Sequence, residues 1–471
     1  MKYSYIVPAA LLLLSSCGDF LEESSQDEIR PTTVEDLASV MYAEAYPQNT
    51  TEDAYLILLT DEVQSNGLSI DQYANAFECG QNVYCFDPEM FDGVKTFVND
   101  MNSWKNYYDR IKGCNVILDY AEEMNGNEDA KKTMVGQARL LRAFYYLKLA
   151  GIYCQPWQNG NPDTNLGVPL ITSSHVSDVQ PARNTLRETY DFIEDQLKIA
   201  AQELDGFKPT TVYRVTKTVA DVLLARLYLY KEEWEKAAEY ATIAINEGPQ
   251  LTNFSQLLSV YKSVYDVSNS SEVVWNYGGI IYKSIYFNSG QMYNGKFPYS
   301  GTPELLAMYD QVNDIRRQYT YVQVSTYSGD YYYKIRTYNG NDGEHGIRMA
   351  EAYLIRAEAY ARTNRVSEAL KDINDLRESR YRAGTYVPET ITDANDLLTF
   401  ILKERQREFV WEDGFRWMDI KRLGLNVKHT FIDENGVSTE FELKANDLLY
   451  ALPIPQDAIS KNKNLIQNPR N

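Results

Sequence analysis

The sequence predicts a mostly α-helical protein, in which a tetratricopeptide-like scaffold of helix pairs carries long loop-rich insertions and a few short β-hairpins. The first observation is a repeat of small and aromatic residues, each member recurring 132 residues later: Ala225 as Ala357, Tyr228 as Tyr360, and Ala237 as Ala369. The second is the pair Ala143 and Tyr146, which has the same three-residue spacing and predicts a third first helix. Because such helix pairs bury their apolar faces only by stacking, we expect at least about three or four of them.

The N-terminal residues predict a bacterial lipoprotein signal. Lys2 precedes an apolar run at 6–14, and Leu14-Ser15-Ser16-Cys17 resembles a lipobox. The run is shorter than the roughly 20 apolar residues that span a bilayer. We therefore predict a signal peptide at residues 1–16, a lipidated N-terminal Cys17 after cleavage, and an acidic tether at 17–31. The alternative is a buried N-terminal helix with an incidental cysteine.

The rest of the chain is expected to form one integrated globular body, with an N-terminal helical part at 32–250 and a C-terminal part at 251–471. The first helix is predicted to begin at the Thr32-Thr33 cap, with Glu35 in capping-box spacing from Thr32. Residues 60–100 are rich in Asn, Gln, Asp, Gly and aromatics and predict loops with short irregular helices, and residues 250–340 have little helical periodicity; these two stretches are the predicted insertions. Within the second insertion, β-forming residues at 319–327 and 331–338 around Ser328-Gly329-Asp330 predict a hairpin. A further helix is expected at 397–409, before Gly414.

Charge and composition narrow the classes of ligand. The formal net charge of −20 and the isoelectric point near 4.7 argue against nucleic acid or an anionic lipid surface as a partner. The chain contains 38 tyrosines, more than packing requires. A tyrosine offers an apolar ring face and a hydroxyl with few rotatable bonds, which suits polar ligands that have apolar faces.

No cysteine or histidine pattern predicts a metal or a cofactor. Four cysteines remain after Cys17, and an exported location permits a bridge between Cys79 and Cys85. Cys114 and Cys154 lie in helical sequence and are expected to be buried thiols. Only three histidines are present, and no cysteine pair has zinc-finger spacing. We therefore expect no metal site and no cofactor.

No sequence motif predicts catalysis. Glu404, Glu408 and Glu412 share a helix face, and we interpret them as salt-bridged structural residues, with Lys403, Arg405 and Arg407 as partners. A glycosidase needs two carboxylates across one bond, and a chain with 66 acidic residues does not exclude such a pair. The tryptophans expected in the core or in helix packing are Trp104, Trp234, Trp411 and Trp417.

A series of motifs along the chain carries a family resemblance. In order, they are Asn115-Val116-Ile117-Leu118, Ala138 to Tyr146, Thr216 to Tyr230, Tyr309 with Asp314-Ile315-Arg316, Arg348 to Ala359, Glu404-Arg405 with Gly414-Phe415-Arg416-Trp417, and Pro453-Ile454-Pro455 with Gln467-Asn468-Pro469. With the lipobox in front, the series resembles the SusD/RagB family of outer-membrane nutrient-binding lipoproteins over nearly the whole chain. The resemblance implies a helical tetratricopeptide scaffold, an outer-face lipid anchor, glycan capture without catalysis, and a SusC-type TonB-dependent transporter as partner. It does not fix the ligand, because the family includes peptide-capture relatives.

Two loop regions hold the groups that sugar capture needs, which are aromatic faces for the C–H side of a pyranose and polar side chains for its hydroxyls. The predicted ligand-binding residues are Asn66, Tyr73, Tyr84, Phe86, Trp275, Tyr277, Tyr282, Tyr286, Asn288 and Tyr293. We expect Tyr84, Trp275, Tyr277 and Tyr286 to be the leading contacts, since no helical or strand period demands them there. For each aromatic, packing is the alternative. The loops lack a basic cluster, which favours a neutral glycan.

These observations predict a cell-surface, lipid-anchored protein of the outer membrane that captures an oligosaccharide or polysaccharide and delivers it to a SusC-type transporter. It is not expected to be an enzyme. One alternative is capture of peptides or another nutrient on the same scaffold. The other is a purely protein-binding helical scaffold.

Overall fold

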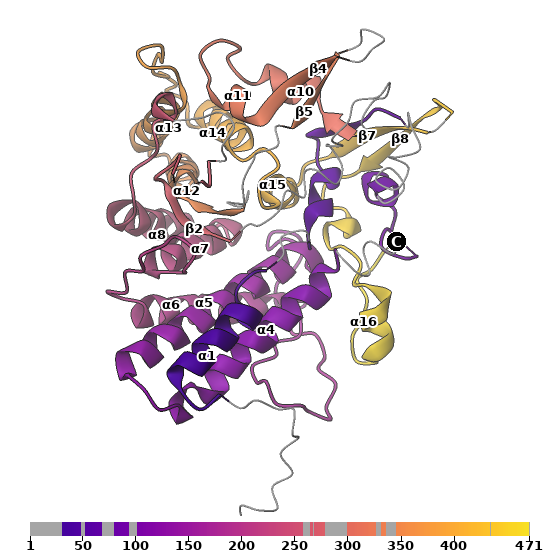
Figure 1. The fold of residues 1–471 in the computed structure, drawn as a ribbon. Helices are drawn as coiled ribbons and strands as arrows, with labels where there is room; N and C mark the ends of the chain where they lie inside the picture. Colours follow the sequence, from indigo (N-terminus) through magenta and orange to yellow (C-terminus); the bar gives the residue numbers. More distant parts are fainter. Residues whose placement is uncertain are drawn as a thin grey trace, which may run out of the picture.

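The structure is a computed structural model and describes residues 31–48, 52–67, 80–93, 101–257, 264–266, 268–277, 299–325, 331–335, 345–433 and 435–470. Its main feature is a stack of antiparallel helices (Figure 1). The stack consists of α4 (Ser103–Tyr120), α5 (Glu128–Tyr153), α6 (Leu186–Glu203), α7 (Lys217–Tyr230), α8 (Trp234–Glu247), α12 (Met349–Arg362), α13 (Val366–Arg380) and α14 (Ala394–Glu408). Each of these helices packs on the next as far as α13, and α14 packs on α12 and α13. The prediction of a mostly α-helical scaffold of helix pairs is therefore confirmed.

The predicted repeat appears as two equivalent helix pairs, α7 with α8 and α12 with α13. Each first helix ends in a tight turn with one residue in the left-handed region, Glu232 at φ 58° and Asn364 at φ 59°. The same turn hydrogen bond closes both pairs, from Glu233 N to Tyr228 O at 2.9 Å and from Arg365 N to Tyr360 O at 2.7 Å. The small repeat residues Ala225, Ala237, Ala357 and Ala369 are fully buried. They let the paired helices approach closely, as the spacing predicts.

The third predicted unit is α5 with α6, and a long loop joins the two helices. Arg142 on α5 links both adjacent helices. Its guanidinium donates to Asn115 Oδ1 of α4 at 2.7 Å and to Gln196 Oε1 of α6. Ala143 and Tyr146 lie in the buried part of α5. The helix α1 (Val34–Val40) covers α4 and α5.

The start of α1 differs by one residue from the prediction. Thr33 is the N-cap, and its hydroxyl accepts a hydrogen bond from Asp36 N at 3.1 Å, while Asp36 Oδ2 accepts from Thr33 N at 3.1 Å. The capping box is thus Thr33 with Asp36 and not Thr32 with Glu35. Both pairs have the required spacing, so the sequence signal does not distinguish them.

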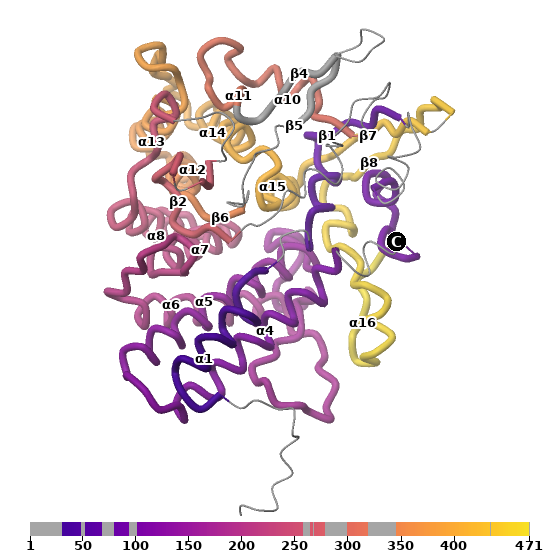
Figure 2. Tube along the Cα trace, in the orientation of Figure 1, coloured from indigo at the N-terminus to yellow at the C-terminus, as the bar shows by residue number. Residues whose placement is uncertain are grey.

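The strands of the described residues form two-stranded antiparallel sheets. The pairs are β1 (Val63–Ser65) with β3 (Tyr299–Gly301), β2 (Val273–Asn276) with β6 (Gly346–Arg348), β4 (Tyr321–Ser325) with β5 (Tyr331–Ile335), and β7 (Val427–Ile432) with β8 (Ser438–Leu443). The β4–β5 hairpin is the one predicted from sequence. Although β1 and β7 are far apart in the chain, they lie side by side (Figure 2).

Short elements complete the described chain. They are η2 (Met41–Ala45), η3 (Ala54–Leu59), η5 (Ala121–Glu123), η6 (Phe254–Gln256), α10 (Pro303–Ala307), α11 (Arg316–Thr320), α15 (Phe415–Arg422), η7 (Leu448–Tyr450) and α16 (Gln456–Lys461). Within the described ranges, no helix has the length and apolar character needed to cross a membrane.

The core contains most of the tryptophans that the sequence places there. Trp104, Trp411 and Trp417 are buried, whereas Trp234 is half-buried under the Arg362 guanidinium, 4.9 Å from its ring centre. Cys114 and Cys154 are buried free thiols, as predicted. Cys85 is a half-buried free thiol, and Cys79 lies outside the described residues.

Candidate functional site

The two loop regions proposed for ligand binding are joined at one place in the fold. Ser65, the last residue of β1, pairs with Tyr299, the first residue of β3. The segment 68–79 begins shortly after β1, and the segment 278–298 ends directly before β3. One end of each segment therefore lies at the same strand pair. Gly80 is the first described residue after 79, and a Cβ built on it would lie 2.8 Å from the Tyr299 ring. Three of the four loop ends thus meet around Tyr299.

A stack of buried aromatic rings packs against this junction. The Tyr84 ring lies 4.0 Å from the His429 ring with an angle of 7° between their planes, and the Phe86 ring also stacks on His429, with 4.6 Å between the two ring centres. The Tyr84 hydroxyl accepts a hydrogen bond from Ser65 N at 3.0 Å. The stack therefore connects the end of β1, the segment after Gly80, and β7.

His429 holds the junction through its ring nitrogens as well. Nδ1 lies 2.7 Å from the carbonyl oxygen of Tyr84, and Nε2 lies 2.8 Å from that of Thr60. Burial lowers the pKa of His429, which favours the neutral ring. A neutral imidazole has one N–H, so it donates to one of the two carbonyls at a time.

Trp275 and Tyr277 lie at the fourth loop end, on and just after β2. The Trp275 ring is fully buried, edge-on to Phe144 at 5.0 Å and tilted against Tyr277 at 4.4 Å. Tyr277 is half-buried and also packs edge-on against Phe144, at 5.2 Å. Both aromatics are therefore packed on α5.

A buried charged cluster lies beneath Tyr277 and joins the two halves of the chain. Lys148 on α5 donates to Asp53 Oδ2 at 2.9 Å and to Asp413 Oδ1 at 2.6 Å. The Tyr107 hydroxyl donates to the same Asp53 oxygen at 2.9 Å. Burial alone would lower the pKa of Lys148, but the Asp413 and Asp53 carboxylates raise it above its usual value. The lysine therefore stays charged and fixes Asp413 against the first half of the fold.

Glu52 borders this cluster and, unlike Lys148, is mostly uncharged at neutral pH. Burial raises its pKa to about 8, so its carboxyl group is mostly protonated at neutral pH. A small cavity is lined by Glu52 and Lys148, and Tyr277 and His345 also line it. The cavity holds about 20 Å³, which is room for one water and not for a sugar.

The structure contradicts the premise of exposed ring faces for three predicted contacts. Trp275 is 0% exposed, Tyr84 is 1% exposed and Phe86 is 6% exposed. Trp275 also lies on a strand, in a run of four buried residues, although the sequence shows no strand period there. A ring with no accessible face offers no stacking surface, so these three residues act as supports of the loop ends in this structure.

The remaining predicted contacts are placed as follows. Asn66 is half-buried, and its Oδ1 accepts from Gln64 Nε2 at 3.1 Å and from Ser300 Oγ at 3.3 Å, across the β1–β3 pair. Tyr277 is half-buried, as described above. Tyr73, Tyr282, Tyr286, Asn288 and Tyr293 lie outside the described residues, as does the predicted lipidation site Cys17. Ligand contact by Asn66, Tyr277 and these undescribed residues stays a prediction.

Glu404 and Glu408 lie on α14, whereas Glu412 lies beyond its end and not on the expected shared helix face; all three carboxylates belong to a buried ion-pair network. Glu404 pairs with Arg316 at 2.7 Å and with Arg377 and Arg407. Glu408 pairs with Arg316, Arg348 and Arg380, and Glu412 pairs with Arg348. Burial by itself raises the pKa of a carboxyl group, but the arginines hold the pKa values of Glu404 and Glu408 well below their usual range. Such carboxylates neither give nor take a proton at neutral pH, so the structural interpretation is confirmed.

The partners in this network differ in part from those expected. Arg407 does contact Glu404, but Arg405 pairs with Asp419 on α15, at 2.9 Å. The other arginines come from α11, β6 and α13. They are distant in sequence, so helix spacing alone did not identify them.

One Ser-His-Asp grouping is present, but its geometry does not fit a catalytic triad. Ser173 Oγ and Asp119 Oδ2 both approach the same nitrogen of His175, Nδ1, at 2.9 and 3.3 Å. A triad needs the serine and the aspartate on opposite ring nitrogens. Asp119 instead accepts hydrogen bonds from Ser173 and Ser174, which fastens the loop to α4. Among the described residues, no group of three or more histidine, cysteine, aspartate or glutamate side chains is arranged to hold a metal ion.

Comparisons with known proteins agree with this architecture. A family model described as starch-binding and associating with the outer membrane matches residues 19–229, and a model of the SusD family matches residues 280–470. The two ranges together cover most of the chain. The chain belongs to the SusD/RagB family.

One sequence relative matches about three quarters of the chain, and two solved structures match more than nine tenths of it. SusD-like protein P2 of Formosa agariphila is 26% identical, over 78% of this chain and 79% of that protein. A SusD superfamily protein from Bacteroides thetaiotaomicron has the same fold, with a TM-score of 0.73, 21% identity, and coverage of 93% and 100% of the two chains. A SusD-like carbohydrate binding protein from Bacteroides vulgatus has a TM-score of 0.67, 19% identity, and coverage of 92% and 98%.

Sequence reasoning missed the β7–β8 hairpin and His429, which hold the junction of this SusD-like fold. A signal was present, because Val427, His429 and Phe431 alternate with the exposed residues Lys428 and Thr430 in the manner of a half-buried strand. Nothing in the sequence indicated that His429 would lie against Tyr84, 345 residues away.

Proposed function

We propose that this protein is a cell-surface glycan-binding lipoprotein, which captures an oligosaccharide or polysaccharide and delivers it to a SusC-type TonB-dependent transporter in the outer membrane. Cys17 carries the lipid anchor, and residues 17–31 form the tether. The protein binds its glycan without cleaving it.

The observation that carries the proposal is the junction of the two tyrosine-rich loops on the β1–β3 pair. Recognition residues on loops need a rigid base to act together. Here the base consists of the strand pair, the Tyr84–His429–Phe86 stack and the helix α5 beneath Tyr277. Relatives support the class of ligand, since solved structures with this fold include proteins named as sugar binding and carbohydrate binding.

Two features support binding without turnover. The acidic residues most suggestive of catalysis are fully committed to arginines. The described part of the chain also has no Ser-His-Asp grouping with triad geometry. The negative net charge of −20 and the absence of a basic cluster in either loop favour a neutral glycan.

The test is a glycan array probed with the purified full-length protein in detergent, followed by a reducing-end assay on every glycan that binds. We expect binding to neutral glycans and no new reducing ends. Binding to peptides alone would support the peptide-capture alternative. Recovery of a transporter in a pull-down without any glycan affinity would support the protein-binding scaffold, and new reducing ends would overturn the non-catalytic assignment.

The anchor is tested separately with Cys17→Ala. Because one acylated cysteine provides the proposed membrane attachment, this variant should appear in the fraction that does not sediment with outer membrane. Cys114→Ala, which changes a buried thiol, is the matched control and should remain with the membrane. If Cys17→Ala still sediments with outer membrane, the anchor assignment is wrong.

A further inference from the structure

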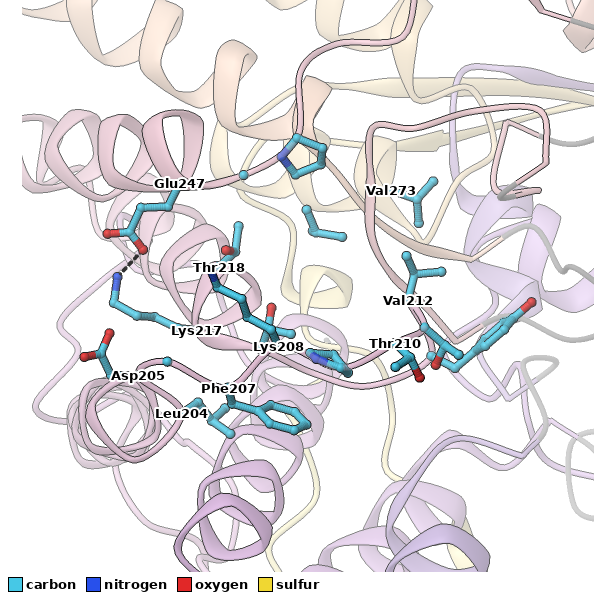
Figure 3. A pocket seen from close by; sticks show the side chains of 18 of the residues that line it. Leu204, Asp205, Phe207, Lys208, Thr210, Val212, Lys217, Thr218, Glu247 and Val273 are labelled. Atoms are coloured by element: carbon cyan, nitrogen blue, oxygen red, sulfur yellow. Dashed lines mark hydrogen bonds and ion pairs between the residues drawn. The ribbon is translucent and has the colours of Figure 1, made fainter. Parts of the chain in front are cut away.

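A large cleft lies away from the β1–β3 junction, between the helix pairs of the scaffold. The loop between α6 and α7 forms one side, and the start of α7, the end of α8 and the residues leading into β2 form the other (Figure 3). We call it the α6–α7 cleft. Its volume is about 880 Å³, within the range of roughly 300–1,000 Å³ that is usual for small-molecule sites. Every residue that lines it is described, and none of them is among the predicted ligand contacts.

The loop wall of this cleft is held in place by other elements. Val212 O accepts a hydrogen bond from Asn276 N of β2 at 2.8 Å. Val215 N donates to the Tyr46 hydroxyl at 3.2 Å. Between them, the Arg214 guanidinium stacks on the Tyr42 ring, 3.6 Å from its centre. The cleft is therefore preformed, as small-molecule sites usually are.

The cleft combines apolar surface with unused hydroxyl groups. Phe207 and Val212 provide partly exposed apolar side chains (Figure 3). Four threonines line the same cavity, and none of their hydroxyls has a hydrogen-bond partner in the described part of the chain: Thr210, Thr211, Thr216 and Thr218. Apolar faces beside free hydroxyls suit a ligand that is itself apolar on one side and rich in hydroxyls on its edge.

Thr216 is the most informative of the four. It occupies the N-cap position of α7 in an extended conformation, yet its side chain makes no capping hydrogen bond. A capping threonine ordinarily stabilises its helix by about 1 kcal/mol. In contrast, Thr33 and Thr185 both cap their helices. The Thr216 hydroxyl is thus left for another partner in the cleft.

Two basic and two acidic side chains line the cleft, so their formal charges sum to zero: Lys208, Lys217, Asp205 and Glu247. Lys217 is paired with both Glu247 and Asp221. Figure 3 shows Glu247, Lys217 and Asp205 at one end of the cleft and Thr210, Val212 and Val273 at the other. Because the charges of the lining sum to zero, the cleft as a whole does not favour an ion of either sign.

We propose that the α6–α7 cleft is a second ligand site, which binds a short neutral oligosaccharide. The sugar's C–H faces lie against Phe207 and Val212, and its hydroxyls bond to the threonines. The choice of a glycan rests on the proposed function, whereas the position of the site rests on the cleft itself.

The test uses neutral hexasaccharides of glucose, mannose and xylose that carry a photoreactive tag. They are cross-linked to the purified full-length protein, and the labelled peptides are mapped by mass spectrometry. We expect label within residues 204–218, in addition to any label on the tyrosine-rich loops. Thr210→Trp fills the cleft from an exposed loop position and should abolish the label at 204–218. Thr390→Trp, an exposed position on the loop before α14, is the matched control and should leave it unchanged.

A second variant removes one hydroxyl without changing shape. Thr216→Val should weaken binding at the cleft by about three- to tenfold, the loss of one hydrogen bond, with the melting temperature unchanged because that hydroxyl caps nothing. Thr390→Val is its control. Label on the loops but not at 204–218, or label that persists in Thr210→Trp, would overturn the second site and leave the proposed function intact. If no hexasaccharide labels either place, the second site is overturned, and the glycan array decides the proposed function separately.

Discussion

Replacing Trp275 distinguishes a buried support of the loops from a ligand platform. The ring is fully buried, edge-on to Phe144 and in contact with Tyr277, and its Nε1 has no hydrogen-bond partner among the described residues. Trp275→Ala therefore removes packing without breaking a hydrogen bond, and burial of this kind contributes about 3–5 kcal/mol. An unfolding entropy of about 2.1 cal/mol/K per residue over roughly 440 residues converts this loss into a fall of about 3–5 °C in Tm.

The assay is thermal unfolding together with glycan affinity, measured at a temperature where each variant is folded. Trp275→Phe retains most of the packing and should lower the Tm by less than half as much. Val387→Ala, at an exposed position, is the surface control and should change stability by less than about 0.5 kcal/mol. Trp275→Ala with an unchanged Tm and affinity reduced more than about tenfold would refute the reasoning, since the ring would then be a ligand contact.

Three further predictions concern stability. Glu408→Gln should lower the free energy of unfolding by about 3–5 kcal/mol, because Arg348 and Arg380 lose the negative charge with which they pair in the core. Glu378→Gln, at an exposed position, is the control and should leave the Tm unchanged. The pKa of Glu408 is low in the folded protein, so its contribution to stability is lost as pH falls below the usual glutamate range. The pKa of Glu52 is raised to about 8 in the folded protein, so its carboxyl group makes stability decline as pH rises from about 4.5 to 8. Denaturant titrations from pH 3 to 9 should therefore show loss of stability on both sides. The alkaline decline should become shallower in Glu52→Gln and not vanish, because burial also raises the pKa of Glu62 to about 8. Finally, Glu232→Gly should stabilise the fold by up to about 1 kcal/mol, since it relieves a left-handed φ, whereas Asn364→Gly should gain less because asparagine tolerates that region; equal effects would contradict this.

The scaffold was predictable because its signal is local. The alanines and tyrosines of a helix pair recur at fixed spacing, and the turns at Glu232 and Asn364 repeat that spacing in space. Helix starts were less certain, because Thr32 with Glu35 and Thr33 with Asp36 satisfy the same capping rule, and only the backbone geometry selects the second.

The sequence shows that aromatic residues gather at the loop ends, but it does not show that several of them are buried. The absence of a helical or strand period around Trp275 was taken to indicate exposure, but β2 is a short strand buried on both faces and shows no alternation. Tyr84 is buried by His429, and Trp275 by Phe144, residues that are distant in sequence. A single sequence does not show such pairings, so the aromatics that support the loops could not be separated from those that face a ligand.

The central claim is that the tyrosine-rich loops bind a glycan, and the most direct measurement is calorimetric titration of one bound neutral oligosaccharide into the double variant Tyr286→Ala, Tyr293→Ala. These residues belong to the sequence segment 278–298, which precedes β3. Because ring stacking contributes a few kcal/mol in total, affinity should fall by at least about tenfold, with a Tm within about 1 °C of the unmodified protein. Unchanged affinity at an unchanged Tm would contradict the claim.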